Sequence, residues 1–239
     1  MNAATREQAD DPATSRGRAL RAGLATVAVF LLVASVVVAL LLSQFGTVRS
    51  GDRPLRTIDE PVGATTDGGL GESWQAIRGR WSTAPQGATV AEPDERISVA
   101  VRPVGGVDGT IEVTGPAEVE GWSVVYRWVD PGTYGLVVLE PDAGEISVVA
   151  VVSDRTRLLG TAALPSADAA LRTVAVELAG PVARVRVDGE LVVAGRDDDL
   201  DGTSAGVALI GAAPGARFDR FRSSPPEDTR SRTVTIGDR

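Results

Sequence analysis

The sequence predicts an all-β domain, a two-sheet antiparallel sandwich, that follows one transmembrane helix. Three observations support this prediction. Between residues 96 and 211, short valine-rich runs alternate apolar with polar or small residues and are separated by turn residues, as is typical of antiparallel strands. No stretch of this region repeats apolar residues with the 3.6-residue period of an amphipathic helix. Near the N-terminus, one long apolar run carries no charge.

The apolar run occupies residues 22–45, and the nearest charged residues on either side are Arg21 and Arg49. At about 1.5 Å per residue, a helix over this run exceeds the roughly 30 Å thickness of the hydrocarbon core. A cleaved signal peptide is the alternative, but its apolar region is usually shorter and ends in small residues, which this run lacks. Arginines are slightly more frequent before the run than just after it, which favours a cytoplasmic N-terminus. We therefore expect a signal anchor in the cell membrane with the C-terminal domain outside the cell.

The composition narrows the possible functions. The 239 residues carry a formal net charge of −8 and include no cysteine and no histidine. Thiol nucleophiles, disulfides, imidazole bases and the common zinc ligand sets are therefore excluded. The acidic balance also makes nucleic acid an unfavourable partner. Any catalysis would depend on aspartate and glutamate.

Two segments without periodicity flank the predicted sandwich. Residues 46–70 mix glycine, proline, threonine and charges, as flexible linkers do. The C-terminal segment contains two prolines and dense charge, as disordered tails do. The predicted parts are a cytoplasmic tail at 1–21, the transmembrane helix at 22–45, the linker at 46–70, the sandwich at 71–223 and the tail at 224–239.

The strands of the sandwich are expected where valine-rich alternation is clearest. These segments are 96–103, 109–115, 121–129, 134–140, 145–152, 172–179, 182–189, 190–196 and 204–211. Pro131-Gly132 and Asp188-Gly189 lie between adjacent segments and predict hairpin turns. Residues 166–173 could form one helical turn at most.

The segment SVVYRWVDPGTYGLVVL, residues 123–139, gathers several aromatic and charged residues. Side chains alternate between the two faces of a strand. Tyr126 and Trp128 are therefore expected on one face of strand 121–129, together with Val124, and Arg127 on the other. The segment then contributes to two faces and does not form a single site.

The order of several short motifs resembles the concanavalin A-like lectin/glucanase superfamily, in particular its LamG-like and 3-keto-disaccharide-hydrolase-like branches. The matching motifs are WQAIRGRWSTAPQG, SVVYRWVDPGTYGLVV, VRVDGELV, GTSAGVAL and ARFDRFRSS, and together they span about residues 72–223. The resemblance implies a jelly-roll sandwich. It implies an activity much less, because this superfamily holds lectins, glycosidases and adhesive modules alike.

Carboxylate groups that could support glycoside cleavage are few. Laminarinase-like relatives carry three acids on one strand, and a retaining glycosidase needs two carboxyls about 5 Å apart. Glu92, Asp94 and Glu95 are the closest match, but Pro93 places them in a turn. Glu118 and Glu120 share a face without a third acid. We expect these groups to be solvated turn residues.

A second group of acids lies in the segment RDDDLDGTSAG. Asp197, Asp199 and Asp201 precede Gly202 and reproduce the first half of a calcium-binding loop. The bidentate acid expected at the twelfth position is replaced by Ala208. Two interpretations stay open: a calcium site that takes other ligands from elsewhere, and an acidic loop in solvent.

Aromatic residues are scarce, so they must serve either the core or a sugar-stacking surface. Core packing is expected for Trp81, Tyr126, Phe218 and Phe221. The candidate ligand-binding residues are Trp122, Arg127, Trp128, Asp130 and Tyr134. Trp122 begins a strand and Trp128 lies near the hairpin turn, so these two are the candidates for exposed stacking. Arg127 is expected to pair with Asp130 or Asp219, with a contact to a sugar hydroxyl as the alternative.

The expected function is non-catalytic recognition of an envelope glycan by a membrane-anchored extracellular module, and the preference for a glycan rests on the resemblance. A structural protein–protein interaction domain is the alternative, favoured if valine and leucine fill the concave sheet face. A glycoside hydrolase is the third hypothesis, and it requires paired carboxylates in a cleft.

Overall fold

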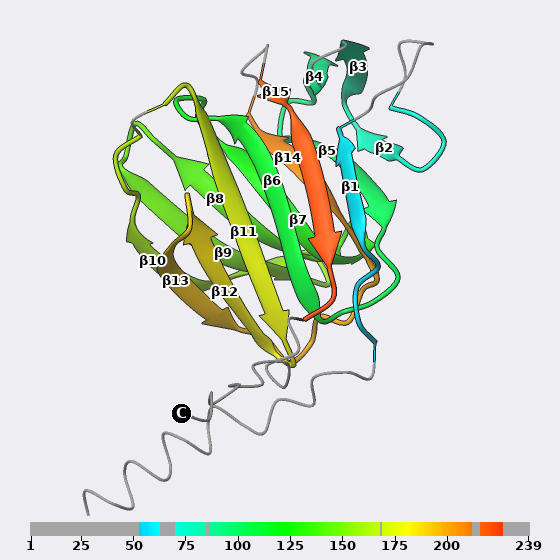
Figure 1. Ribbon diagram of the computed structural model, residues 1–239, viewed down its shortest axis with the longest axis vertical. Coiled ribbons are helices and arrows are strands. Elements are labelled where there is room, and N and C mark those ends of the chain that lie inside the picture. The colour runs from blue at the N-terminus through cyan, green and yellow to red at the C-terminus, as the bar shows by residue number, and fades with distance from the viewer. Residues whose placement is uncertain (1–52, 63–69, 85–86, 168, 212–215, 227–239) are drawn as a thin grey trace, which may run out of the picture. The chain divides into compact units, whose positions relative to one another are not determined.

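The computed structural model describes residues 53–62, 70–84, 87–167, 169–211 and 216–226. Within these residues the protein is all-β: two large sheets face each other as two layers, and a small third sheet lies at one end (Figure 1). The predicted all-β class, the two sheets and their antiparallel pairing are confirmed. The described residues of segment 166–173, for which the sequence allowed one helical turn at most, form no helix.

The first sheet has six strands, and their bounds follow in spatial order. They are β1 (Ile58–Pro61), β16 (Arg220–Ser224), β6 (Gly109–Pro116), β11 (Leu171–Ala179), β12 (Val182–Val187) and β13 (Glu190–Arg196). Between β12 and β13, Asp188 and Gly189 both adopt positive φ angles of 51° and 89°. This is the primed hairpin turn that an Asp-Gly pair favours, as predicted.

The second sheet has seven strands, again given in spatial order. They are β10 (Arg155–Ala163), β9 (Glu145–Val152), β8 (Thr133–Glu140), β7 (Trp122–Asp130), β14 (Ser204–Ile210), β5 (Ile97–Pro103) and β2 (Gln75–Arg78). The small sheet contains β15 (Arg217–Phe218), β4 (Gly87–Glu92) and β3 (Arg80–Ala84).

The predicted linker at 46–70 needs correction. Residues 58–61 form β1, in which Ile58 pairs with Ser223 of β16, and Leu55 and Val62 are buried in the core. Composition hid this strand because it is short, lies at a sheet edge and is half polar, so only pairing with a distant strand defines it. The sandwich also extends through Ser224, one residue into the predicted tail.

A hydrophobic core fills the space between the two large sheets. Inward-facing residues of β6, β11 and β12 alternate with outward polar ones, which is the pattern of a sheet with one buried face. Four aromatic side chains that were expected in the core are fully or almost fully buried there: Trp81, Tyr126, Phe218 and Phe221. Trp81 packs on Phe218 with ring centroids 5.8 Å apart.

The seven-stranded sheet carries a second apolar cluster on its other face. Its members alternate with the core residues of the same strands, so they point away from the six-stranded sheet. They are Ile97, Val99, Val101, Val125, Trp128, Tyr134, Leu136, Val138, Val151 and Ala208. The strands β7, β8 and β9 are consequently apolar on both faces, as their nearly continuous runs of valine indicate.

The predicted transmembrane helix at 22–45 lies outside the described residues. Among the residues that the structure does describe, no helix has the length and apolarity needed to cross a membrane.

Candidate ligand-binding site

The five residues predicted to bind ligand do not come together. Trp122 is 0% exposed and packs edge-to-face on Phe218, with ring centroids 5.9 Å apart. The prediction that Trp122 is exposed was therefore wrong. Its side chain lies on the inward face with Val124 and Tyr126, because residues two apart on a strand share a face.

Trp128 and Tyr134 lie on the outer face of the seven-stranded sheet. Their rings stack at a centroid distance of 4.9 Å and an interplanar angle of 25°, and both side chains are more than nine-tenths buried. Burial raises the pKa of the Tyr134 phenol. Because each ring covers the other, the pair contributes mainly to the outer apolar cluster.

Asp130 belongs to the turn between β7 and β8. Its Oδ1 accepts the backbone N–H of Gly132 at 2.7 Å. This contact closes the Pro131-Gly132 hairpin that the sequence predicts, so Asp130 shapes the turn.

Arg127 interrupts strand β7. The pairing between β7 and β8 is regular up to Tyr126 and resumes at Asp130, and Arg127 itself has a φ of 48°. A left-handed backbone is uncommon for arginine and changes the direction of the following side chains. Trp128 consequently lies on the face opposite to Tyr126, which corrects the predicted shared face.

The Arg127 side chain points to one end of the sandwich and is 3% exposed. Its Nε and Nη2 donate to the Val107 carbonyl at 3.2 Å each, and Nη2 also donates to the Gly180 carbonyl. The nearest carboxylate is Asp108, with Oδ1 3.5 Å from Nη2. The expected partners Asp130 and Asp219 were wrong, since Asp130 holds its own turn and Asp219 pairs with Arg217 at 2.6 Å.

The charge of Arg127 is compensated only partly. Burial lowers the pKa of its guanidinium, and the Asp108 carboxylate acts in the opposite direction. Arginine remains protonated under such conditions because its intrinsic pKa is very high. The end of the sandwich therefore holds a buried positive charge among backbone carbonyls, with Asp108 as its nearest carboxylate and Asp197 and Asp201 farther away.

Gly202 lets the loop after β13 approach the backbone of β7 where Arg127 interrupts that strand. A Cβ atom at this position would lie 2.2 Å from the Trp128 carbonyl oxygen and 2.5 Å from that of Arg127. The Asp201-Gly202 step, read from sequence as part of a calcium loop, is required here for close backbone approach. The loop after β13 thereby packs directly against the irregular part of β7.

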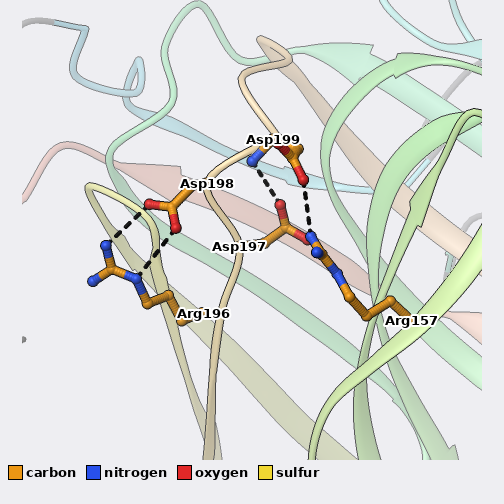
Figure 2. Close-up of polar contacts among 5 residues, drawn as sticks. All are labelled: Arg157, Arg196, Asp197, Asp198 and Asp199. Carbon is orange, nitrogen blue, oxygen red and sulfur yellow. Dashed lines mark hydrogen bonds and ion pairs between the residues drawn. The ribbon is translucent and has the colours of Figure 1, made fainter.

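The loop after β13 carries three consecutive aspartates whose side chains point in alternating directions (Figure 2). Asp197 Oδ2 and Asp199 Oδ2 both contact Arg157 Nη2, at 2.5 and 3.0 Å, whereas Asp198 turns to Arg196 at 3.0 Å. The second oxygen of Asp197 accepts the Asp199 amide at 2.7 Å. The hydrogen bonds that Arg157 donates to Asp197 and Asp199 raise the pKa of its guanidinium, the one to Asp197 most strongly.

This arrangement does not support the predicted calcium site at Asp197, Asp199 and Asp201. Arg157 supplies the positive charge that calcium was expected to supply. Within the described part of the chain, no three acidic side chains converge on a point where a metal ion could bind.

The carboxylates considered for glycoside cleavage hold turns and ion pairs. Glu92 pairs with Arg80, and Asp94 Oδ1 accepts the amides of Arg96 and Ile97 at 3.0 and 3.4 Å. The amide of Arg96 contributes most to a lowered pKa of Asp94. The turn interpretation is confirmed for Asp94, whereas Glu92 ends strand β4.

A cavity of about 250 Å³ opens at the end of the sandwich where Arg127 meets the loop after β13. Asp108, Arg127, Asp197 and Asp201 line it together with Gly180, Pro181 and Leu200. Asp108, Arg127 and Asp197 are each 4% exposed or less. Charged groups are seldom buried so deeply unless they are paired or face a ligand. This cavity is our candidate site.

Two polar atoms of the cavity lack a protein partner. Among the described residues, neither Nη1 of Arg127 nor Oδ2 of Asp108 forms a hydrogen bond. Neither atom is cut off from solvent, so both can contact water or a ligand. The Asp201 carboxylate likewise forms no hydrogen bond or close ion pair with the described residues, and it interacts with Arg127 only over a longer distance. The cavity thus offers one cationic donor and carboxylate acceptors.

Sequence reasoning found Arg127, Asp197 and Asp201 but placed them in two different sites. It missed Asp108 and Arg157 entirely. The motif GGVDGT around Asp108 has the composition of an ordinary turn. Arg157 lies in β10, whose partners across the sandwich cannot be read from local pattern.

Comparisons with known proteins support the fold. No protein-family model matches the chain, and no curated protein sequence matches it. The carbohydrate-binding module CBM66 from Bacillus subtilis superposes with a TM-score of 0.56 at 15% identity, over 64% of this chain and 95% of that one. The apo Crh5 transglycosylase superposes with a TM-score of 0.50 at 12% identity, over 74% and 88%. At such identities the likeness shows the fold alone, a two-sheet antiparallel β-sandwich.

Proposed function

We propose that this chain is a non-catalytic binding module that recognises a terminal sugar of an envelope glycan in the cavity at the end of the sandwich. The observation that carries the proposal is the set of buried charges at this cavity, with Arg127 Nη1 and Asp108 Oδ2 open to solvent. Sugar hydroxyls donate and accept hydrogen bonds at once, so they match a site that offers both kinds of group.

The size of the cavity agrees with a single ring. Sites for larger organic ligands typically enclose about 300–1,000 Å³, and this cavity measures about 250 Å³. The fold likeness to a carbohydrate-binding module adds support. It does not replace the argument from the site, since the same fold also occurs in a transglycosylase.

A binding role suits the carboxylates better than hydrolysis does. Both oxygens of Asp197 are occupied, one by the Asp199 amide and one by Arg157. Both oxygens of Asp197 are therefore oriented by protein donors, which suits a structural role for this carboxylate. Asp108 accepts the Gly180 amide through Oδ1 at 2.9 Å, which orients the carboxylate, and its Oδ2 stays available to accept a hydrogen bond from a ligand.

Protein–protein interaction is the second candidate function, because one specific observation favours it. The outer face of the seven-stranded sheet is filled by valine, leucine and isoleucine side chains. A sheet face of this composition contrasts with the six-stranded sheet, whose outward residues include Glu112, Glu177, Arg186 and Arg222. Apolar sheet faces can serve as contact surfaces where they are exposed, and the members of this cluster are each 8% exposed or less.

The proposal includes the membrane anchor. Residues 22–45 would hold the chain in the cell membrane as a single-pass protein with the sandwich outside the cell. The support is the uncharged length of that run and the arginine bias around it.

A glycan array probed with the full chain in detergent tests the proposal. Asp201→Asn removes the free carboxylate at the cavity and should weaken binding of a recognised glycan about tenfold or more, as expected for a hydrogen bond to a charged group. Asp142→Asn is the matched control, since Asp142 is exposed in the turn between β8 and β9 and is not part of the cavity lining. Absence of glycan binding, or equal loss in both variants, would refute the proposed site.

A further inference from the structure

A second hollow adjoins the candidate cavity. It measures about 400 Å³ and is lined by Val152, Ser153, Arg155, Arg157 and Asp199. The contacts of Arg157 with Asp197 and Asp199 form the boundary, because Asp197 lines the cavity while Arg157 and Asp199 line the hollow (Figure 2). A ligand that extends beyond the cavity on this side therefore enters the hollow.

The two spaces differ in charge. The cavity lining contains four aspartates and one arginine, Arg127. The hollow lining contains two arginines and one aspartate, and that aspartate, Asp199, is already paired with Arg157. Across one narrow boundary, the surface changes from acidic to basic.

The donors of the hollow are mostly unused. Arg155 is exposed and forms no ion pair or side-chain hydrogen bond with any described residue. Arg157 makes both of its contacts through Nη2, which leaves Nε and Nη1 without partners in the described structure. The carboxylate of the neighbouring Asp154 lies against Gly132 and is not part of the lining.

The position of Arg155 is set by a tight turn. Ser153 and Asp154 connect β9 to β10 with φ angles of 51° and 62°, and the Asp154 amide donates to the Gly132 carbonyl at 3.1 Å. The turn is thereby attached to the hairpin between β7 and β8. Arg155, the first residue of β10, is held beside Arg157 of the same strand.

We propose that the hollow is a second subsite, which takes an anionic group (a carboxylate, sulfate or phosphate) carried by the glycan next to its terminal sugar. This inference rests on the proposed function. Guanidinium groups bind such oxyanions through paired hydrogen bonds. The acidic cavity repels the same group, so the charge pattern fixes which unit of the ligand enters which space.

The test compares glycans in matched pairs that differ only in one acidic substituent, with the full chain in detergent on an array. The acidic member should bind about fivefold more tightly, as expected for an exposed ion pair with guanidinium, and the preference should shrink as salt rises. Arg155→Gln should bring the two members to equal affinity. Arg96→Gln is the matched control, because Arg96 is exposed and lies at the C-terminal end of strand β14, whereas the loop that carries Asp199 precedes its N-terminal end.

The outcomes separate this inference from the proposed function. Equal affinity of the two members in the unmodified chain, or a preference that survives Arg155→Gln, overturns the second subsite. If neutral glycans still bind and Asp201→Asn weakens them, the proposed function stands without it. If no glycan of either kind binds, both are overturned.

Discussion

Replacing Asp108 by asparagine tests the central electrostatic feature of the fold. Asp108 and Arg127 have side-chain exposures of 5% and 3%, and their charged atoms lie 3.5 Å apart. Asparagine has nearly the same shape and can still accept the Gly180 amide that now bonds Oδ1. The substitution therefore removes the charge and little else.

The expected cost follows from burial. Breaking a buried ion pair by removing one partner costs about 3–5 kcal/mol, because an uncompensated charge remains. We expect about 3 kcal/mol, the lower limit, since the Val107 and Gly180 carbonyls still accept hydrogen bonds from Arg127. The exposed pair between Arg157 and Asp199 gives the contrast: Asp199 is 58% exposed, and Asp199→Asn should cost less than about 1 kcal/mol.

Urea unfolding of the full chain in detergent, followed by tryptophan fluorescence, measures both free energies of unfolding. The double variant Asp108→Asn with Arg127→Met should recover most of the loss, because it leaves no buried charge. Similar small losses for Asp108→Asn and Asp199→Asn would refute the argument. So would a double variant that is less stable than Asp108→Asn alone.

Three further predictions concern packing and pH. Gly202→Ala should destabilise the domain by at least about 1–3 kcal/mol, since its Cβ would meet the Trp128 carbonyl oxygen at 2.2 Å; an unchanged melting temperature would contradict the close approach. Trp122→Ala should cost about 3–5 kcal/mol in urea unfolding, and a loss below about 1 kcal/mol would contradict its burial. The pKa of Asp59 is lowered to about 2, first by its hydrogen bond with Arg220 and then by that with Arg222. Because the folded-state pKa lies below the unfolded value, ionised Asp59 stabilises the fold above about pH 4 and this contribution is lost as the pH falls toward 2. Asp59→Asn should therefore make the stability profile flatter between pH 4 and 2, and an unchanged slope would count against it.

Several features of the site had no local signal. Asp108 precedes a glycine in a turn-like stretch, and nothing in GGVDGT distinguishes it from other turn aspartates. The face of the sheet on which Trp128 lies depends on one residue, Arg127, whose positive φ interrupts strand β7. Trp122, in contrast, could have been placed correctly from sequence, because its two-residue spacing from Val124 puts it on the inward face.

The sequence alone determined the nine valine-rich strands β5–β9 and β11–β14 and the all-β class, because alternation and turn chemistry act between neighbouring residues. Only the tertiary structure decided which charges meet. Arg127 contacts Val107 and Gly180, residues 20 and 53 positions away, and Asp197 contacts Arg157 from another strand. Such contacts depend on how distant strands pair and on one irregular backbone angle, and neither property is encoded in a short window of residues.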